Sequence, residues 1–361
     1  MLGLLLVVTL KLEKLYSYTY KMYPQHVLLA VVVASFALPA ATFRIPGPEL
    51  RRFPAMSATM PLPMPPRTSH EILRGGGPTM TQTGALALPA CWGLATTACS
   101  LAFIRQAYVF SLSYGLSMAM IGAYILSAIP TGAPAVLTYH AWLVIAYGVR
   151  LFGFLLWRQI GQDSGWAQRL AALDKTPRSK RAPLVISTSL FYALMASPLL
   201  FHLQSGSGAL GMPFSIVSMI GCAAAAFGLL LEAVADHTKS LFKIQLRKSG
   251  AADRPPTGGV WAFSRHANYL GEIIFWVGAT VAGLPSLLVP DLALLTRFLR
   301  ALSMGLGLSG IVFIMISATN RLEQKQAERA PSTWPVLKKD GTFDSYQDYV
   351  ARSGKLLPKV F

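Results

Sequence analysis

The chain has 361 residues, of which 53% are hydrophobic and only 13% are charged, and its mean hydropathy is +0.47. These values argue against an ordinary soluble domain and are typical of a polytopic membrane protein. The net charge of +17 raises the question of nucleic-acid binding, but the basic residues lie in connections between apolar segments. That distribution favours anionic membrane lipids over nucleic acid as the partner of the basic residues.

Residues 1–82 differ from the rest of the chain. They carry eight Lys/Arg against three Glu, and the part from Arg44 to Gln82 is rich in Pro, Met, Arg, Ser, Thr and Gly. Such a stretch ahead of a membrane core is typical of a targeting leader or a disordered tail. The alternative is an extra membrane helix at 26–43, which barely exceeds the ~17 residues that a span needs. We predict a leader, and therefore an organelle such as the plastid, or else the endoplasmic reticulum, as the location.

From Thr83 onward the chain contains seven apolar segments close to the ~20 residues that cross the hydrocarbon core. They cover residues 83–104, 108–130, 135–157, 184–202, 214–235, 269–290 and 297–318. The sequence therefore predicts an all-α membrane domain at residues 83–361, a bundle of about seven transmembrane helices with a multi-pass topology.

The connections indicate the orientation of this domain. Lys and Arg gather in residues 158–183, in residues 236–268 and in the tail from Thr319. The connections 131–134 and 203–213 carry no charged residue. Because basic connections stay on the cytosolic or stromal side, the domain should begin outside and end inside. Arg297 and Arg300 start the last segment from the opposite side, where they must pair locally or snorkel.

One polar stripe enters the sixth apolar segment. Read as a helix from about Ser264, this stretch aligns Arg265, Asn268, Tyr269 and Glu272 at i, i+3, i+4 and i+7 on one face. Such a face would be unfavourable against lipid, so we expect it to line a cavity at the membrane boundary. A charged cofactor could meet an apolar substrate there.

A second stripe leaves the fifth apolar segment toward the same basic side. It places Glu232, Asp236, Lys239 and Lys243 at i, i+4, i+7 and i+11. Two interpretations are open. The stripe is either a solvated exit helix held by ion pairs, or an edge that binds ribose hydroxyls through carboxylates and phosphates through lysines.

Two single residues each have two interpretations. Arg150 lies too deep in the third segment for its charge to remain unpaired, so it either pairs with Glu232 or Glu272 or binds a ligand. Trp261 follows the pair Gly258-Gly259 and is either an interfacial belt residue or part of a loop close to a ligand.

Metal chemistry finds no support in the sequence. The cysteines and the isolated histidines, His140 and His202 among them, lack ligand spacing. The tail of 43 residues from Thr319 is too short for a separate catalytic domain, and we expect it to fold back over the cytosolic mouth.

The order of these motifs resembles a known family. The motifs are Glu232, Ala235-Asp236, Phe242, Gly259-Val-Trp, Ser264-Arg-His-Ala-Asn-Tyr-Leu-Gly-Glu, Trp276-Val-Gly, and Tyr346 and Tyr349 ahead of Pro358. In order and spacing, residues 140–361 are similar to the DUF1295 membrane proteins of the steroid 5-alpha-reductase C-terminal superfamily.

The resemblance implies a seven-helix reductase with a cytosolic mouth for NADPH, which transfers a hydride to an activated carbon–carbon double bond of a lipid or sterol-like substrate. It implies cofactor contacts at Asp236, Asn268, Tyr269 and Glu272, with Arg265 and His266 adjacent and Lys239, Lys243 and Arg321 around the phosphates. It does not single out a catalytic residue. Steroid reductases carry a glutamate in an early span, whereas residues 108–130 contain no Asp or Glu, and Tyr114, Tyr124 and Tyr147 are the candidate proton donors.

Two other function classes remain open. The family motif Arg-His-Pro-Asn-Tyr has Ala267 here in place of proline. The related isoprenylcysteine carboxyl methyltransferase fold binds S-adenosylmethionine with an Arg-His-Pro-x-Tyr motif, and Ala267 with Asn268 favours the reductase branch over it. The third interpretation is a non-catalytic lipid-binding membrane protein.

Overall fold

The computed structural model describes residues 80–359 except 162–173, 206–211, 291 and 335–344. The predicted leader therefore lies outside the described residues, apart from Met80 to Gln82, which begin the first described helix. The possible helix at 26–43 also lies outside them.

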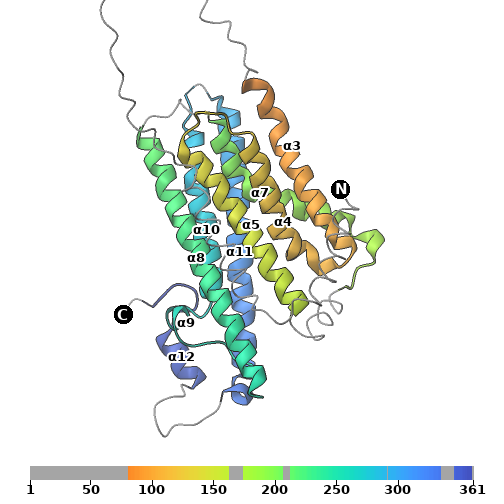
Figure 1. Cartoon of the computed structure of the whole chain (residues 1–361), viewed down its shortest axis with the longest axis vertical. Coiled ribbons are helices and arrows are strands. Elements are labelled where there is room, and N and C mark those ends of the chain that lie inside the picture. Colours follow the sequence, from red (N-terminus) through yellow and green to blue (C-terminus); the bar gives the residue numbers. More distant parts are fainter. Residues whose placement is uncertain (1–79, 162–173, 206–211, 291, 335–344, 360–361) are drawn as a thin grey trace, which may run out of the picture.

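The described residues are helical (Figure 1), as predicted. The α-helices are α3 Met80–Cys99, α4 Leu112–Ser127, α5 Ala135–Gly161, α7 Ala182–Gln204, α8 Met212–Lys248, α9 Val260–Phe263, α10 Ala267–Gly283, α11 Leu294–Thr333 and α12 Tyr346–Arg352. Short 3-10 helices are η1 Ser100–Phe103, η2 Gln106–Phe110, η3 Arg178–Lys180 and η4 Leu284–Leu287. Extended pairing in this part of the chain is limited to one isolated bridge, between Ser264 and Gly354.

Five of these helices are long and apolar enough to cross a membrane. They are α5, α7, α8, α10 continued into η4, and α11. The first two predicted segments form shorter apolar helices, Leu88–Phe103 and Leu112–Ser127. The protein is therefore an integral multi-pass membrane protein, and the count of seven spans stays a prediction.

α8 and α11 are longer than a membrane span. α11 has 40 residues, which at ~1.5 Å rise per residue gives a length near ~60 Å, about twice the hydrocarbon core. The C-terminal end of α11, from Asn320 onward, is rich in charged residues. Figure 1 shows the lower ends of α8 and α11 projecting from the bundle, with α9 and α12 beside them. This projecting end contains the basic connection 236–268 and the start of the basic tail from Thr319.

Two antiparallel helix pairs are packed backbone to backbone through glycines. A Cβ atom added to Gly228 on α8 would lie 2.4 Å from the Phe275 nitrogen, and one added to Gly271 on α10 would lie 2.6 Å from the Glu232 nitrogen. In the pair α4 and α5, a Cβ on Gly148 would lie 2.4 Å from the Ala119 nitrogen. Glycines let membrane helices approach this closely. The contact at Gly271 brings α10 directly against Glu232.

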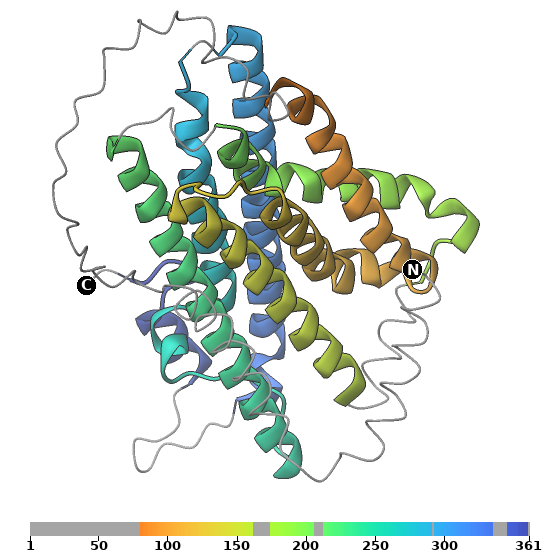
Figure 2. The same ribbon diagram turned by 45° about the horizontal axis from the view of Figure 1, so that its top comes forward.

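α7 joins these pairs to α3 and α11. In the turned view of Figure 2 it runs across the bundle behind α3 and α4. The Trp92 indole of α3 donates to Ser189 Oγ at 3.0 Å, and the Tyr192 hydroxyl of α7 donates to the Val109 carbonyl at 2.8 Å. Gly307 places α11 against Leu194.

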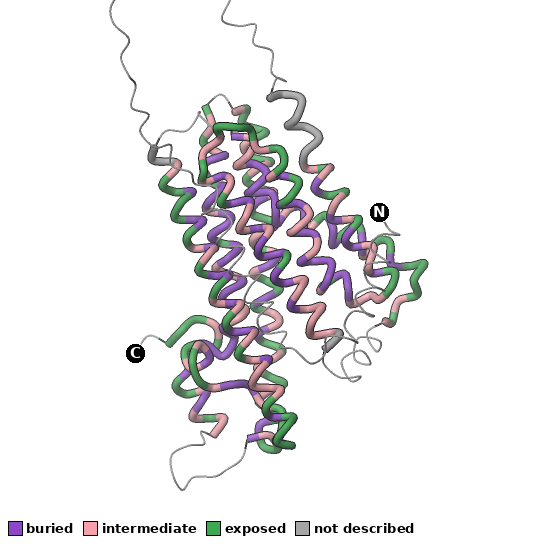
Figure 3. The backbone as a smooth tube through the Cα atoms, viewed as in Figure 1, coloured by how far each residue is buried: buried purple, intermediate pink, exposed green. Residues whose placement is uncertain are grey.

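The outer surface of the bundle is apolar where lipid is expected. Figure 3 shows buried residues along the inner faces of the helices and exposed residues on the outside. Ile220, Phe227, Phe298 and Phe313 are among the exposed large side chains of α8 and α11. Exposed apolar side chains on long apolar helices are typical of a lipid-facing surface.

The two arginines at the start of α11 do pair locally. Arg300 donates to the Ser286 carbonyl at 3.0 Å and to Gln204 Oε1 at 3.1 Å, and Arg297 donates to the Val289 carbonyl at 3.5 Å. Their partners are neutral backbone and amide oxygens. This resolves the exception to the charge pattern without altering the predicted orientation.

Candidate functional site

A buried ion-pair cluster lies between α5 and α8. Arg150 Nη1 lies 2.6 Å from Glu232 Oε1, and Arg150 Nη2 lies 2.5 Å from Asp236 Oδ2. Arg150 and Glu232 are each 3% exposed. Charges at this depth are stable only when paired and hydrogen-bonded. Of the two partners predicted for Arg150, the structure selects Glu232 and adds Asp236.

α10 completes this cluster from the other side. The amide Nδ2 of Asn268 donates to Asp236 Oδ1 at 3.2 Å. Three buried atoms of the cluster, Glu232 Oε2, Asn268 Oδ1 and Arg150 Nε, have no hydrogen-bond partner among the residues that the structure describes. Buried polar atoms are normally satisfied. The two oxygens are therefore suited to accept hydrogen bonds from the hydroxyl or amide groups of a ligand.

A second polar cluster lies among aromatic side chains. The Tyr114 hydroxyl donates to Glu272 Oε1 at 2.9 Å, lies 2.9 Å from the Tyr147 hydroxyl, and accepts from Trp276 Nε1 at 2.7 Å. The ring of Tyr192 stacks on Tyr114 with centroids 5.1 Å apart. These residues come from α4, α5, α7 and α10. They meet because the two glycine-packed helix pairs, α4 with α5 and α8 with α10, enclose the same buried core.

The two clusters adjoin along one face of α10. Asn268, Glu272 and Trp276 follow each other at intervals of four residues, as the predicted stripe requires. The charges of Glu232 and Glu272 lie close enough to interact, and Tyr147 interacts with both. Tyr114 and Tyr147, two of the three candidate proton donors, belong to this cluster, whereas Tyr124 is 39% exposed.

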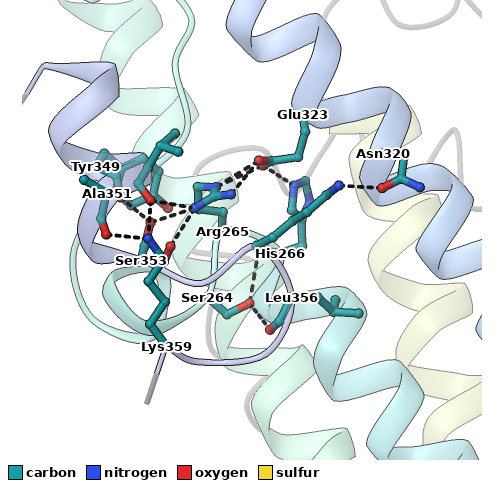
Figure 4. A network of polar contacts seen from close by, with 12 residues as sticks. Ser264, Arg265, His266, Asn320, Glu323, Tyr349, Ala351, Ser353, Leu356 and Lys359 are labelled. Carbon is teal, nitrogen blue, oxygen red and sulfur yellow. Dashed lines mark hydrogen bonds and ion pairs between the residues drawn. The ribbon is translucent and has the colours of Figure 1, made fainter. Parts of the chain in front are cut away.

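The prediction that Arg265 shares this face is wrong. α10 begins at Ala267, and Ser264 is extended, with φ −136° and ψ 128°. The backbone N–H of Arg265 donates to the Gly354 carbonyl at 2.9 Å. Pairing with the C-terminal segment thus keeps residues 264–266 out of the helix, and the Arg265 side chain turns to Glu323 instead (Figure 4).

The predicted basic residues Lys239, Lys243 and Arg321 lie in the C-terminal parts of α8 and α11. Lys239 Nζ lies 5.0 Å from the centre of the Trp261 ring and within electrostatic range of Lys243 and Arg158. Tyr269 lies within range of Arg158 and Arg321. Asp236 therefore marks the boundary between buried carboxylates and an outer basic rim.

Trp261 is not an interfacial belt residue. It is 1% exposed, and its Nε1 donates to Thr238 Oγ1 at 3.1 Å. Lys243 forms an ion pair with Asp253 at 3.1 Å. The carboxylates of the second stripe therefore form ion pairs with Arg150 of α5 rather than with the lysines of their own helix, and the ligand-binding interpretation of this stripe stays a prediction.

Sequence reasoning missed two contacts. Glu323 joins Arg265 and His266, and His140 Nδ1 lies 3.2 Å from His202 Nδ1. No pattern in the sequence could indicate these contacts, because their partners come from distant helices. Among the described residues, no group of three or more His, Cys, Asp and Glu could hold a metal ion.

Residues 102–330 match the family described as protein of unknown function DUF1295. The chain belongs to this family. The match covers more than half of the chain and includes the site residues from Tyr114 to Glu323, so the family membership indicated by the motifs is confirmed. No curated protein and no solved structure matches the chain.

Proposed function

We propose that this DUF1295 protein is a membrane reductase that uses NADPH to reduce an activated carbon–carbon double bond of a lipid or sterol-like substrate. The observation that carries the proposal is the continuous face of α10. It joins a basic rim, a carboxylate cluster with unsatisfied oxygens, and the buried pair Tyr114 and Glu272.

The residues present fit a dinucleotide phosphate. Glu232 Oε2 and Asn268 Oδ1 are free to accept hydrogen bonds from ribose hydroxyls or a carboxamide. Lys239 with Lys243 near it, and Arg321 near Tyr269, would attract phosphate charge. S-adenosylmethionine carries a sulfonium cation and no phosphate, so a basic rim favours NADPH over it.

NADPH, when bound, would supply the hydride. The complementary proton would come from the Tyr114 hydroxyl. After that proton leaves, the Tyr114 oxygen would still accept hydrogen bonds from Trp276 Nε1 at 2.7 Å and from the Tyr147 hydroxyl at 2.9 Å. Two such donors stabilise a developing phenolate. Glu272, with Oε1 2.9 Å from the same oxygen, would then take up a proton from water and pass it to the Tyr114 phenolate.

The surroundings favour an apolar substrate. Tyr114, Tyr147 and Trp276 are buried inside a bundle whose outer surface is apolar. The cofactor mouth, in contrast, lies at the charged cytosolic end. A substrate would enter from the bilayer and meet the cofactor along α10, which makes a membrane lipid the substrate class proposed.

Cofactor titration on the purified protein tests this function. We expect NADPH to raise the melting temperature in detergent, and S-adenosylmethionine to leave it unchanged. Asn268→Ala and Asp236→Asn should each weaken NADPH binding about tenfold or more, which corresponds to ~1.4 kcal/mol.

The matched control is Lys325→Gln on the projecting end of α11, which should bind NADPH like the parent. Stabilisation by S-adenosylmethionine alone would replace the reductase with the methyltransferase function. Stabilisation by neither compound would favour the non-catalytic lipid-binding protein.

A further inference from the structure

A polar network at the cytosolic end takes no part in the proposed reaction. Glu323 Oε2 of α11 accepts hydrogen bonds from Arg265 Nη2 at 2.7 Å and from Arg265 Nε at 3.0 Å. Its other oxygen, Oε1, lies 2.8 Å from His266 Nε2. Figure 4 shows the carboxylate between these two side chains. Arg265 and His266 are the two residues that directly precede α10.

The C-terminal segment binds the same short stretch. Arg265 Nη1 donates to the Ser353 carbonyl at 2.6 Å, and Ser264 Oγ donates to the Leu356 carbonyl at 2.6 Å. The Gly354 N–H donates to the Phe263 carbonyl at 3.0 Å. A Cβ atom at Gly354 would lie 1.7 Å from the Leu357 carbonyl oxygen, so this backbone contact requires glycine.

Tyr349 fastens this segment to the rim of the site. Its ring is fully buried, and its hydroxyl donates to the Trp261 carbonyl at 2.9 Å. Trp261 in turn donates a hydrogen bond to Thr238, and its ring faces the Lys239 ammonium group. We call Glu323 together with residues 345–357 the C-terminal clasp.

Hydrogen bonds and neighbouring positive charge keep Glu323 ionised. The residue lies in the part of α11 beyond its apolar stretch, outside the membrane. Burial alone would raise the pKa of this carboxyl, but hydrogen bonds from His266 and Arg265 and their charges lower the pKa to about 2. At neutral pH the clasp therefore holds a negative charge against the start of α10.

We propose that Glu323 is a positioning residue for the site, and that the clasp sets where α10 begins. Asn268 lies in the first turn of α10, and the His266 ring stacks on Tyr269 with centroids 5.7 Å apart. Fixing residues 264–266 therefore fixes the approach of Asn268 to Asp236. This inference rests on the proposed function for its effect on NADPH, but its effect on α10 is independent of any ligand.

The first measurement uses no cofactor. Hydrogen exchange by mass spectrometry should show faster exchange at residues 264–270 in Glu323→Gln than in the parent, with the apolar part of the bundle unchanged. The matched control is Glu328→Gln, which removes an exposed carboxylate from the same helix. Unchanged exchange at residues 264–270 in Glu323→Gln would overturn the proposal.

The second measurement is NADPH affinity in a double-mutant cycle. Glu323→Gln should weaken binding about tenfold, and adding Asn268→Ala should weaken it little further, because both changes act through the same side chain. Fully additive effects would show that Glu323 does not act through Asn268 and would overturn the positioning role.

Two outcomes separate the proposals from each other. Faster exchange at residues 264–270 without NADPH binding in the parent would retain the clasp and remove the reductase function. If Glu323→Gln fails to fold, Gly354→Ala tests the same contacts from the tail, and it should accelerate exchange at residues 264–270. Unchanged exchange in that variant would overturn the proposal.

Discussion

Two buried glutamates of this protein differ in their partners. Glu232 is neutralised by Arg150 at 2.6 Å, whereas Glu272 accepts a hydrogen bond from Tyr114 among aromatic rings. A carboxyl paired with an arginine has its charged form stabilised by that partner. One that faces a phenol can exchange a proton with it. This difference assigns Glu232 to binding and Glu272 to proton transfer in the proposed reaction.

Removing one partner of the buried ion pair should destabilise the fold. Arg150→Leu leaves Glu232 and Asp236 as uncompensated buried carboxylates, and breaking a buried pair in this way costs about 3–5 kcal/mol. We expect Arg150→Leu to lower the melting temperature strongly and the triple variant with Glu232→Gln and Asp236→Asn to recover part of the loss. Equal melting temperatures for Arg150→Leu and the parent would contradict the ion-pair assignment.

Glu272 should tolerate loss of its charge. The amide of Glu272→Gln is isosteric and can still bond to Tyr114, so we expect a folded protein that retains NADPH binding and has lost the proton relay. The measurement compares the melting temperature and NADPH affinity with the rate of NADPH oxidation in lipid-containing membranes. The sequence-based prediction that Glu272 contacts the cofactor would instead hold if affinity fell about tenfold.

The clasp should weaken in acid. Because the folded pKa of Glu323 is lowered from 4.5 to about 2, its contribution to stability is complete above pH 4.5 and is lost as the pH falls toward 2. Limited proteolysis of the C-terminal segment between pH 6 and pH 3 would show this loss as faster cleavage. Glu323→Gln should be cleaved at a rate that changes less over the same interval.

At the scale of helices, the glycine contacts decide which side chains meet. Gly228 and Gly271 allow α8 and α10 to touch through their backbones, and this contact sets Glu232 beside the polar face of α10. Wider spacing would separate Asp236 from Asn268, whose contact is already 3.2 Å. The packing of α8 on α10 is therefore part of the site.

A single methyl group at this contact should be destabilising. Gly228→Ala would place a Cβ 2.4 Å from the Phe275 nitrogen, and overpacking of this kind costs about 1–3 kcal/mol. Gly305→Ala on α11 is the matched control, because a Cβ at Gly305 has no neighbour within 4 Å. We expect a lower melting temperature for Gly228→Ala alone. A parent-like melting temperature for Gly228→Ala would show that α8 and α10 are not packed this closely.

For the whole molecule, the structure separates an apolar bundle from a charged projecting end. The projecting ends of α8 and α11, together with α9 and α12, form that end (Figure 1). The proposed cofactor mouth lies at the junction between the two parts, where Asp236 meets Lys239. A site at this junction can receive a charged cofactor from water and an apolar substrate from lipid.

Labelling of single cysteines tests this orientation. Lys180→Cys, Ser249→Cys and Ser332→Cys should react from one side of the membrane, and Thr131→Cys from the other. The native cysteines Cys91, Cys99 and Cys222 are buried and should stay unlabelled. Reaction of Thr131→Cys from the same side as Ser249→Cys would contradict the predicted topology.

The sequence by itself determined the class of the protein and the faces of its helices. Apolar runs near spanning length can satisfy their backbone in lipid only as helices. The spacing of Glu232 and Asp236, and of Asn268 and Glu272, predicted correctly which residues share a face, because helical periodicity is a local property.

Only the tertiary structure decided which faces meet. It selected Glu232 over Glu272 as the partner of Arg150, across 82 residues, and it joined Tyr114 to Glu272 across 158. It also removed Arg265 from the stripe, because the C-terminal segment pairs with residues 263–265 and Ser264 is extended there. Such contacts depend on how closely distant helices pack, and in this protein glycines on α4, α5, α8 and α10 determine that distance.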